Sequence, residues 1–234
     1  MVAVVLAAVG PREDGDMKMQ SPAEKFLTPE EQQKITAAVQ EAERRTSGEI
    51  VPMIVSRSHG YPMAAATCAV SFSLPLALVL TTLLGRALWI GPQNMWLMLG
   101  LFAILYVIFY PLVMGRDWLK FYFLNSSLVE HEVQEGALAA FYSEQLYKTK
   151  HENGILLYIS VLEKKVWILG DHGINEKIDQ QMWDSVVADL TNGIRSGNRC
   201  ESICAAVQKI GEILRQHFPY HRDDRDELHN LIIR

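Results

Sequence analysis

Hydrophobic residues are concentrated in two uncharged blocks near the middle of the chain, residues 64–84 and 95–115. Each block would form a helix roughly 31 Å long, which matches the hydrocarbon core of a bilayer. The short connection between them carries Gly85, Gly91 and Pro92, which predicts a tight reversal of the chain. We therefore predict a transmembrane helical hairpin over residues 61–116, in preference to a hairpin buried inside a soluble core.

Aromatic and basic residues at the ends of the two blocks predict how the hairpin sits in a bilayer. Tryptophans expected to contact the membrane interface are Trp89, Trp96 and Trp118. Five basic residues flank the outer ends, namely Arg44, Arg45, Arg57, Arg116 and Lys120, whereas the connection has only Arg86. Because positive residues collect on the cytoplasmic side, we predict a two-pass protein whose soluble part and termini are cytoplasmic.

Outside the hairpin, helical and strand patterns alternate along the chain. Four segments have the apolar spacing of amphipathic helices: residues 28–48, 133–150, 178–194 and 199–218. Three short apolar segments are typical of strands: residues 49–55, 154–161 and 165–169. A helix between the first two strands favours a parallel pair, and the tight turn before the third favours an antiparallel one. The pattern predicts an α/β fold, with Pro52 at an edge or irregular position of its strand.

Composition narrows the classes of function. The chain has 234 residues and a formal net charge of -5, which argues against a nucleic-acid partner that needs a basic face. Three cysteines are too few for a disulfide framework, and Cys200 and Cys204 share the apolar face of one predicted helix, so we interpret them as core residues.

The domain organisation follows from these segments. The α/β domain is predicted to comprise residues 21–60 and 125–218, with the hairpin inserted between them. Residues 1–20 are expected to be a disordered or over-extended N-terminus, because Met17 is a more natural first residue and residues 1–16 would then be an upstream extension. Residues 219–234 form a tail dense in charge.

Three parts of the soluble sequence occur in a specific order and spacing: the motif RTSGEIV at residues 45–51, residues 139–174, and the helix pair through residues 190–219. Together they resemble the TPM domain, a family named for a thylakoid acid phosphatase, a photosystem II repair protein and a receptor-modulating protein. The motif residues matched in this chain are Thr46, Ser47, Gly48, Gly154 and Gly173. The resemblance implies a mixed sheet with helices on both faces.

The chain departs from the family pattern in two places. A hairpin stands between the first strand and the second helix, which we assign to a bacterial subgroup with membrane hairpins. The usual acidic position after the third strand is occupied by Asn175. This loss weakens any transfer of a metal or phosphatase site from the family.

Acidic residues after the third strand are the best candidates for metal chemistry. Asp171 occupies a glycine-flanked loop near the start of the strand that begins at Glu49, and Glu176 and Asp179 follow it closely. Oxygen-rich groups of this kind suit Ca²⁺ or Mg²⁺. The alternative is that Asp171 caps the loop backbone and Asp179 caps the following helix.

The turn between the second and third strands carries Lys164 and Lys165. Two parallel strands end at the same edge of a sheet, so this turn is expected at the membrane-facing edge, where the lysines can contact anionic headgroups. An ordinary solvated turn is the alternative. Asp171 is expected roughly 17 Å away, at the opposite edge.

The favoured function is a non-catalytic interaction or accessory module at the cytoplasmic membrane face, with a membrane-protein partner or a role in protein quality control. One alternative is a divalent-metal-dependent acid phosphatase. The other is an assembly subunit whose helices pack into a larger membrane complex.

Overall fold

The computed structural model describes residues 21–89, 91, 94–116, 119–120, 124, 126–149, 152–220 and 228–234. The expectations for residues 1–20 and for Trp118 concern positions that lie outside the described residues.

One mixed sheet forms the centre of the α/β part, with strand order β3-β2-β1-β4. The strands are β1 (Glu49–Val55), β2 (Gly154–Ser160), β3 (Lys165–Gly170) and β4 (Ile232–Ile233). β1 runs parallel to β2, and β3 runs antiparallel to β2. The predicted α/β class and the mixed sheet are confirmed.

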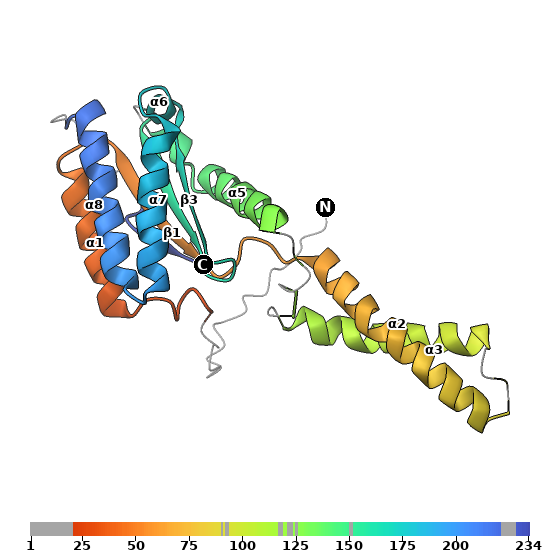
Figure 1. The fold of residues 1–234 in the computed structure, drawn as a ribbon. Helices are drawn as coiled ribbons and strands as arrows, with labels where there is room; N and C mark the ends of the chain where they lie inside the picture. Colours follow the sequence, from red (N-terminus) through yellow and green to blue (C-terminus); the bar gives the residue numbers. More distant parts are fainter. Residues whose placement is uncertain are drawn as a thin grey trace, which may run out of the picture.

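Helices cover both faces of the sheet (Figure 1). On one face lie α1 (Pro29–Glu43), α7 (Gln180–Arg195) and α8 (Arg199–His217); on the other lies α5 (Ser126–Ser143), followed by the 3₁₀ turn η1 (Leu146–Lys148). Ile50 and Ile54 of β1 pack in the core beneath the three helices, whereas Val51 and Met53 pack beneath α5. Because successive side chains of a strand point to opposite faces, β1 contributes to both cores.

Pro52 lies at a position of β1 that has a strand neighbour on one side only, within the described part of the chain. The N–H of Ile50 points away from β2, toward the Glu43 carboxylate, and strand alternation gives position 52 the same direction. Among the described residues, β4 pairs with Met53 and Ile54 and leaves Pro52 without a strand partner on that side. The missing N–H of proline therefore costs no ladder hydrogen bond, as the sequence predicted.

The C-terminal residues require a correction. The sequence analysis placed residues 219–234 in a charged tail, but Ile232 and Ile233 form β4 beside β1, and the Arg234 N–H donates to the Ile54 carbonyl at 2.9 Å. A strand of two residues has no periodicity that a sequence pattern can reveal. Apolar side chains of this C-terminal segment pack at the edges of both cores.

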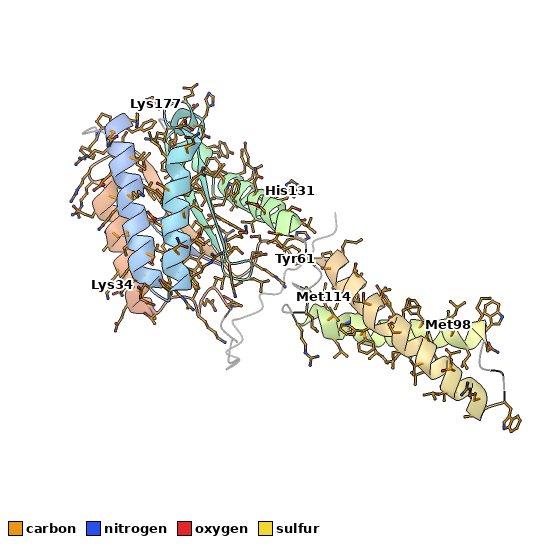
Figure 2. All side chains as sticks on the ribbon, viewed as in Figure 1. Lys34, Tyr61, Met98, Met114, His131 and Lys177 are labelled. Carbon is orange, nitrogen blue, oxygen red and sulfur yellow. The ribbon has the colours of Figure 1, made fainter. Side chains whose placement is uncertain are left out.

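The two apolar blocks form long helices that pack against each other, α2 (Pro62–Ala87) and α3 (Met95–Met114). They project away from the sheet and its covering helices (Figure 1). Both are long and apolar enough to cross a membrane. Their side chains are almost entirely carbon, whereas nitrogen and oxygen gather on the α/β part (Figure 2).

Candidate functional site

The two ends of the sheet differ in chemistry. At the hairpin end, β1 and β2 finish, residues 56–61 lead into α2, and residues 161–164 form the turn into β3. At the far end, β1 and β2 begin and β3 finishes, followed by Asp171 and the short helix α6 (His172–Asn175). The turn and Asp171 therefore lie at opposite ends, as the strand directions predicted.

A buried carboxylate fastens the hairpin end. Glu163 accepts hydrogen bonds from the Ser58 N–H at 3.0 Å, from the Tyr61 hydroxyl at 2.9 Å and from the Ser160 hydroxyl. The Leu162 N–H also donates to the Ser56 carbonyl at 3.1 Å. These bonds hold the turn after β2 against the segment that leads into α2, so the base of the hairpin is tied to the sheet.

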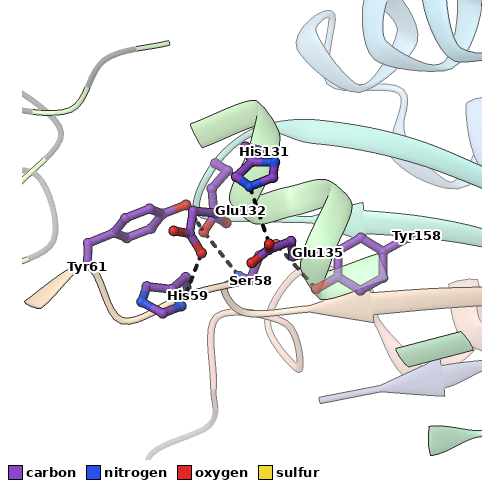
Figure 3. Close-up of polar contacts among 8 residues, drawn as sticks. Ser58, His59, Tyr61, His131, Glu132, Glu135 and Tyr158 are labelled. Atoms are coloured by element: carbon purple, nitrogen blue, oxygen red, sulfur yellow. Dashed lines mark hydrogen bonds and ion pairs between the residues drawn. The ribbon is translucent and has the colours of Figure 1, made fainter. Parts of the chain in front are cut away.

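Helix α5 supports the same segment from the other side (Figure 3). His59 Nδ1 lies 3.2 Å from Glu132 Oε2, and the Tyr158 hydroxyl donates to Ser58 Oγ at 3.2 Å. Gly136 permits this approach, because a Cβ at that position would lie 2.9 Å from the Tyr158 hydroxyl oxygen. At the hairpin end, the turn between β2 and β3, the linker of residues 56–61 and helix α5 therefore meet in one junction.

The electrostatics of the junction keep its phenols protonated. Burial, followed by the nearby Glu163 carboxylate, raises the pKa of Tyr61 far above its ordinary value. Burial also raises the pKa of Tyr158. A protonated phenol is the hydrogen-bond donor that Glu163 requires, so the contact persists across the physiological pH range. No local sequence pattern predicts this junction, because Ser58 and Glu163 are separated by about a hundred residues of chain.

The far end brings two of the predicted acidic residues to the same face of the sheet. Glu49 is opposite Gly154 in the β1–β2 ladder, and the Asp171 N–H donates to the Gly154 carbonyl at 2.9 Å. Strand spacing places the two Cα atoms about 10 Å apart, on either side of a residue without a side chain. The Leu146 carbonyl oxygen lies 2.6 Å from where a Gly154 Cβ would stand.

The Asp171 side chain has one satisfied and one unsatisfied oxygen. Oδ1 accepts from the His172 N–H at 2.7 Å, which caps α6 as the alternative interpretation predicted. Oδ2 is buried and has no hydrogen-bond partner among the described residues. Glu49 and Asp171 flank Gly154 in the sheet, and the Leu146 carbonyl lies over the same glycine, so the oxygens at this end come from these three residues.

The other two predicted ligands make different contacts. Glu176 Oε1 lies 3.0 Å from His172 Nε2 on the surface, and Asp179 Oδ1 accepts from the Gln181 N–H at 3.2 Å, capping α7. Within the described part of the chain, no group of three or more histidine, cysteine or acidic side chains is arranged to hold a metal ion. Any cation at the far end would thus depend on Asp171, Glu49 and backbone oxygens.

Most of the residues that match the TPM motif lie around the start of β1 and the end of α8. The Thr46 hydroxyl donates to the Phe218 carbonyl at 2.6 Å, and the Ser47 N–H donates to the same oxygen at 3.0 Å. A Cβ on Gly48 would lie 2.8 Å from Leu214, so glycine lets α8 approach the start of β1. Gly173 lies within α6. The motif joins the end of α8 to the first strand.

The residues predicted to contact a membrane are placed as follows. Trp89 is 95% exposed and Trp96 is 79% exposed, both near the connection between α2 and α3. Lys165 Nζ lies 4.0 Å from Glu130 Oε2, and Lys164 stands in the turn with a φ of 53°. Both lysines line a cavity at the hairpin end.

Comparison with known proteins agrees with this architecture. Residues 123–213 match the family model of the TPM domain. The chain contains a TPM domain. The match runs from just before α5 into α8, and β1 and α1, from the other side of the hairpin, pack against β2 and α8 of the matched part.

A solved structure supports the fold of the TPM domain. The chain is similar to the NMR structure of the BA42 protein from the psychrophilic bacterium Bizionia argentinensis, with a TM-score of 0.54 and 23% identity, over 88% of this chain and 94% of that one. At this identity the likeness concerns the fold. No curated protein is similar enough to this chain to count as a relative.

Proposed function

We propose that the protein is a membrane-anchored accessory module. In this proposal α2 and α3 cross the bilayer, and the TPM domain stands at the cytoplasmic face, where it binds a membrane-protein partner without catalysing a reaction. The observation that carries the proposal is the exposed apolar surface of the hairpin, joined to the domain through the hydrogen-bonded junction at Glu163.

The exposure of the hairpin supports a membrane span in preference to a core helix. In the most apolar stretch of α3 only 6% of the residues are buried, and in that of α2 33%. Large apolar side chains exposed on both helices include Leu78, Val79, Leu83, Ile104, Val107 and Ile108. Exposed apolar side chains along the length of both helices favour a cover of lipid or of another apolar surface.

The orientation is supported by charge. Arg57 and Arg116 stand just outside the two helices on the domain side, whereas Arg86 lies near the opposite end of α2. Positive residues favour the cytoplasmic side, and Trp89 and Trp96 at the connection suit the opposite headgroup region.

Fractionation of cells that express the full chain tests the anchor. We expect the protein to stay with membranes through alkaline carbonate extraction and to require detergent for release. A protease added outside intact spheroplasts should leave the TPM domain uncut, whereas the same protease should cut it after lysis. Release by carbonate, or cleavage from outside, would contradict the anchor or its orientation respectively.

Crosslinking in native membranes tests the partner. We expect one membrane protein to be captured reproducibly by the intact chain, and its capture to fall when exposed residues of the TPM domain carry charge reversals. Capture of no protein under conditions that crosslink a known membrane complex would contradict an accessory role.

A metal-dependent phosphatase is the second candidate, because the buried Asp171 Oδ2 lacks a partner beside the Glu49 carboxylate. The assay is hydrolysis of p-nitrophenyl phosphate by the detergent-solubilised protein with Ca²⁺ or Mg²⁺ and with a chelator. Our proposal expects no turnover. Metal-dependent turnover that Asp171→Asn abolishes and Asp189→Asn leaves intact would replace it with the phosphatase.

A further inference from the structure

A cavity of about 490 Å³ opens at the hairpin end, on the face covered by α7 and α8. Its walls come from residues 22–26, the end of β2, the start of β3, the last turn of α7 and the first residue of α8. Five basic residues line it: Lys25, Lys164, Lys165, Arg195 and Arg199. The described residues lining this cavity include no acidic side chain.

Two other cavities show that this charge is unusual for the molecule. A cavity at the far end combines Arg45 and Arg215 with Glu41 and Glu212. A cavity between α5 and α7 shares the two turn lysines and Arg195 but adds Glu130 and Asp184. Every charged side chain that lines the cavity at the hairpin end is basic among the described residues, although the net charge of the whole chain is -5.

The cations of this cavity are largely uncommitted. Among the described residues, Lys25, Lys164 and Arg195 have no carboxylate within 4.0 Å. Arg199 is held in place, with its guanidinium 4.7 Å from the centre of the Phe26 ring and an N–H donated to the Phe26 carbonyl at 3.2 Å. Positive charges gathered in one cavity create a positive electrostatic potential, which favours the binding of an anion.

The chemistry of the walls suits a phosphate group attached to a less polar body. Arginine and lysine side chains bind phosphate oxygens through charge-assisted hydrogen bonds. Ile159, Val161, Val166 and Ile194 supply apolar surface between the cations. A ligand with a phosphate group and an apolar part would contact both the basic and the apolar walls of the cavity. A free inorganic anion would contact the basic side chains alone.

The position of the cavity favours one source of such a ligand. The Val161 N–H, in its wall, donates to the Val55 carbonyl at 3.0 Å, at the end of β1. From there the chain reaches Pro62, the first residue of α2, within seven residues, so the strand end is within about 25 Å of the hairpin. A lipid surface around α2 and α3 would bring headgroups to this end of the domain.

We propose that this cavity binds the phosphate headgroup of an anionic phospholipid. The inference rests on the proposed membrane anchor, and it adds a specific lipid site to that anchor. Lys25, Lys164 and Arg195 contact the phosphate oxygens, and Arg199 completes the positive wall. Bound lipid would hold the TPM domain with its hairpin end against the bilayer.

The test is a lipid titration of the full chain in neutral detergent, followed by native mass spectrometry. The probes are short-chain phosphatidylglycerol, short-chain phosphatidylcholine and glycerol 3-phosphate. We expect one tightly bound phosphatidylglycerol, with at least tenfold weaker binding of phosphatidylcholine. The triple variant Lys25→Gln, Lys164→Gln, Arg195→Gln should bind phosphatidylglycerol about a hundredfold more weakly, since each cation near an anionic headgroup contributes about fivefold.

The matched control removes the same charge from the far end, with Arg44→Gln, Arg45→Gln and Arg215→Gln, and should bind like the native chain. Equal binding by the two triple variants would overturn the cavity as the site. Equal affinity for glycerol 3-phosphate and phosphatidylglycerol would show a soluble phosphate ligand and overturn the lipid assignment.

Circular dichroism of both variants establishes that they fold. If the membrane anchor is wrong, carbonate extraction will release the protein. The titration in detergent still tests whether the cavity binds lipid, because it does not depend on insertion into a bilayer.

Discussion

The hairpin end and the far end of the sheet each hold buried carboxylates, but they satisfy them differently. Glu163 at the hairpin end accepts three hydrogen bonds, whereas Asp171 at the far end keeps one buried oxygen without a partner among the described residues. A fully satisfied carboxylate contributes to stability, and an unsatisfied one costs free energy. The difference indicates that the Glu163 carboxylate contributes to holding the hairpin end together, whereas the Asp171 carboxylate is stabilised by fewer contacts.

The largest effect is expected at the far end, from Gly154→Ala. The new Cβ would stand 2.6 Å from the Leu146 carbonyl oxygen, which is backbone and cannot move aside cheaply. We expect a loss of about 3 kcal/mol, which is roughly 6–12 °C in the unfolding midpoint followed by circular dichroism. Gly60→Ala is the control, because no atom lies within 4 Å of its Cβ. A change under 2 °C for Gly154→Ala would show that the far end is not tightly packed.

The next effect is expected at the hairpin end, from Glu163→Gln. The amide cannot accept all three hydrogen bonds, and its NH₂ group faces donors, so the free energy of unfolding should fall by about 1.5–3 kcal/mol. Hydrogen exchange of the Ser58 amide should quicken at the same time, because Glu163 is its acceptor. Unchanged exchange at Ser58 would mean that Glu163 does not fasten the linker.

Tyr61→Phe removes one hydrogen bond from the same carboxylate and leaves the other two. We expect a loss of about 1 kcal/mol, smaller than that of Glu163→Gln. Thermal unfolding of both single variants and the double variant checks this. If the two losses add, the hydroxyl and the carboxylate act independently and the junction is not a unit.

A smaller effect is expected from divalent cation at the far end. Millimolar Ca²⁺ should raise the unfolding midpoint of the native chain by a few degrees if Asp171 and Glu49 bind it, and should leave Asp171→Asn unchanged. Asp179→Asn, which only alters a helix cap, serves as control. Equal shifts in all three proteins would assign the effect to nonspecific binding.

The smallest effect concerns a residue that belongs to neither end. Burial, followed by the neighbouring Cys200, raises the pKa of Cys204 to about 11. Because the thiolate is the reactive form, alkylation by iodoacetamide should be slow at pH 8 and should quicken about tenfold for each pH unit up to that value. Glu163→Gln should leave this rate unchanged if the hairpin end opens locally. A faster rate in that variant would mean that the core opens with it.

Much of the fold could be predicted from the sequence because its signals are local. The uncharged blocks predicted α2 and α3 to within three residues at each end, and the strand patterns predicted β1, β2 and β3. The parallel and antiparallel pairings followed from the lengths of the connections. Pro52 indicated an open edge that the short β4 leaves in place.

What could not be predicted depends on contacts between distant residues. In the sequence, Glu163 has only the pattern of an ordinary turn residue. The folded chain is what places Ser58 and Tyr61 beside it. At the far end, Asp171 and Glu49 were correctly brought to one edge by strand direction, but the position of Leu146 over Gly154 arises from packing. Glu176 and Asp179 were grouped with Asp171 by sequence proximity, and their side chains turn to other partners.

The insertion of the hairpin between β1 and β2 sets an order for biosynthesis. β1 cannot pair with its central neighbour until the ribosome has made the whole stretch 56–153 and β2 after it. At ordinary translation speeds this takes on the order of ten seconds. On the proposed topology, α2 and α3 are delivered to the insertion machinery during that interval, while β1 waits unpaired. On that topology, the sheet closes only after both membrane helices have left the ribosome.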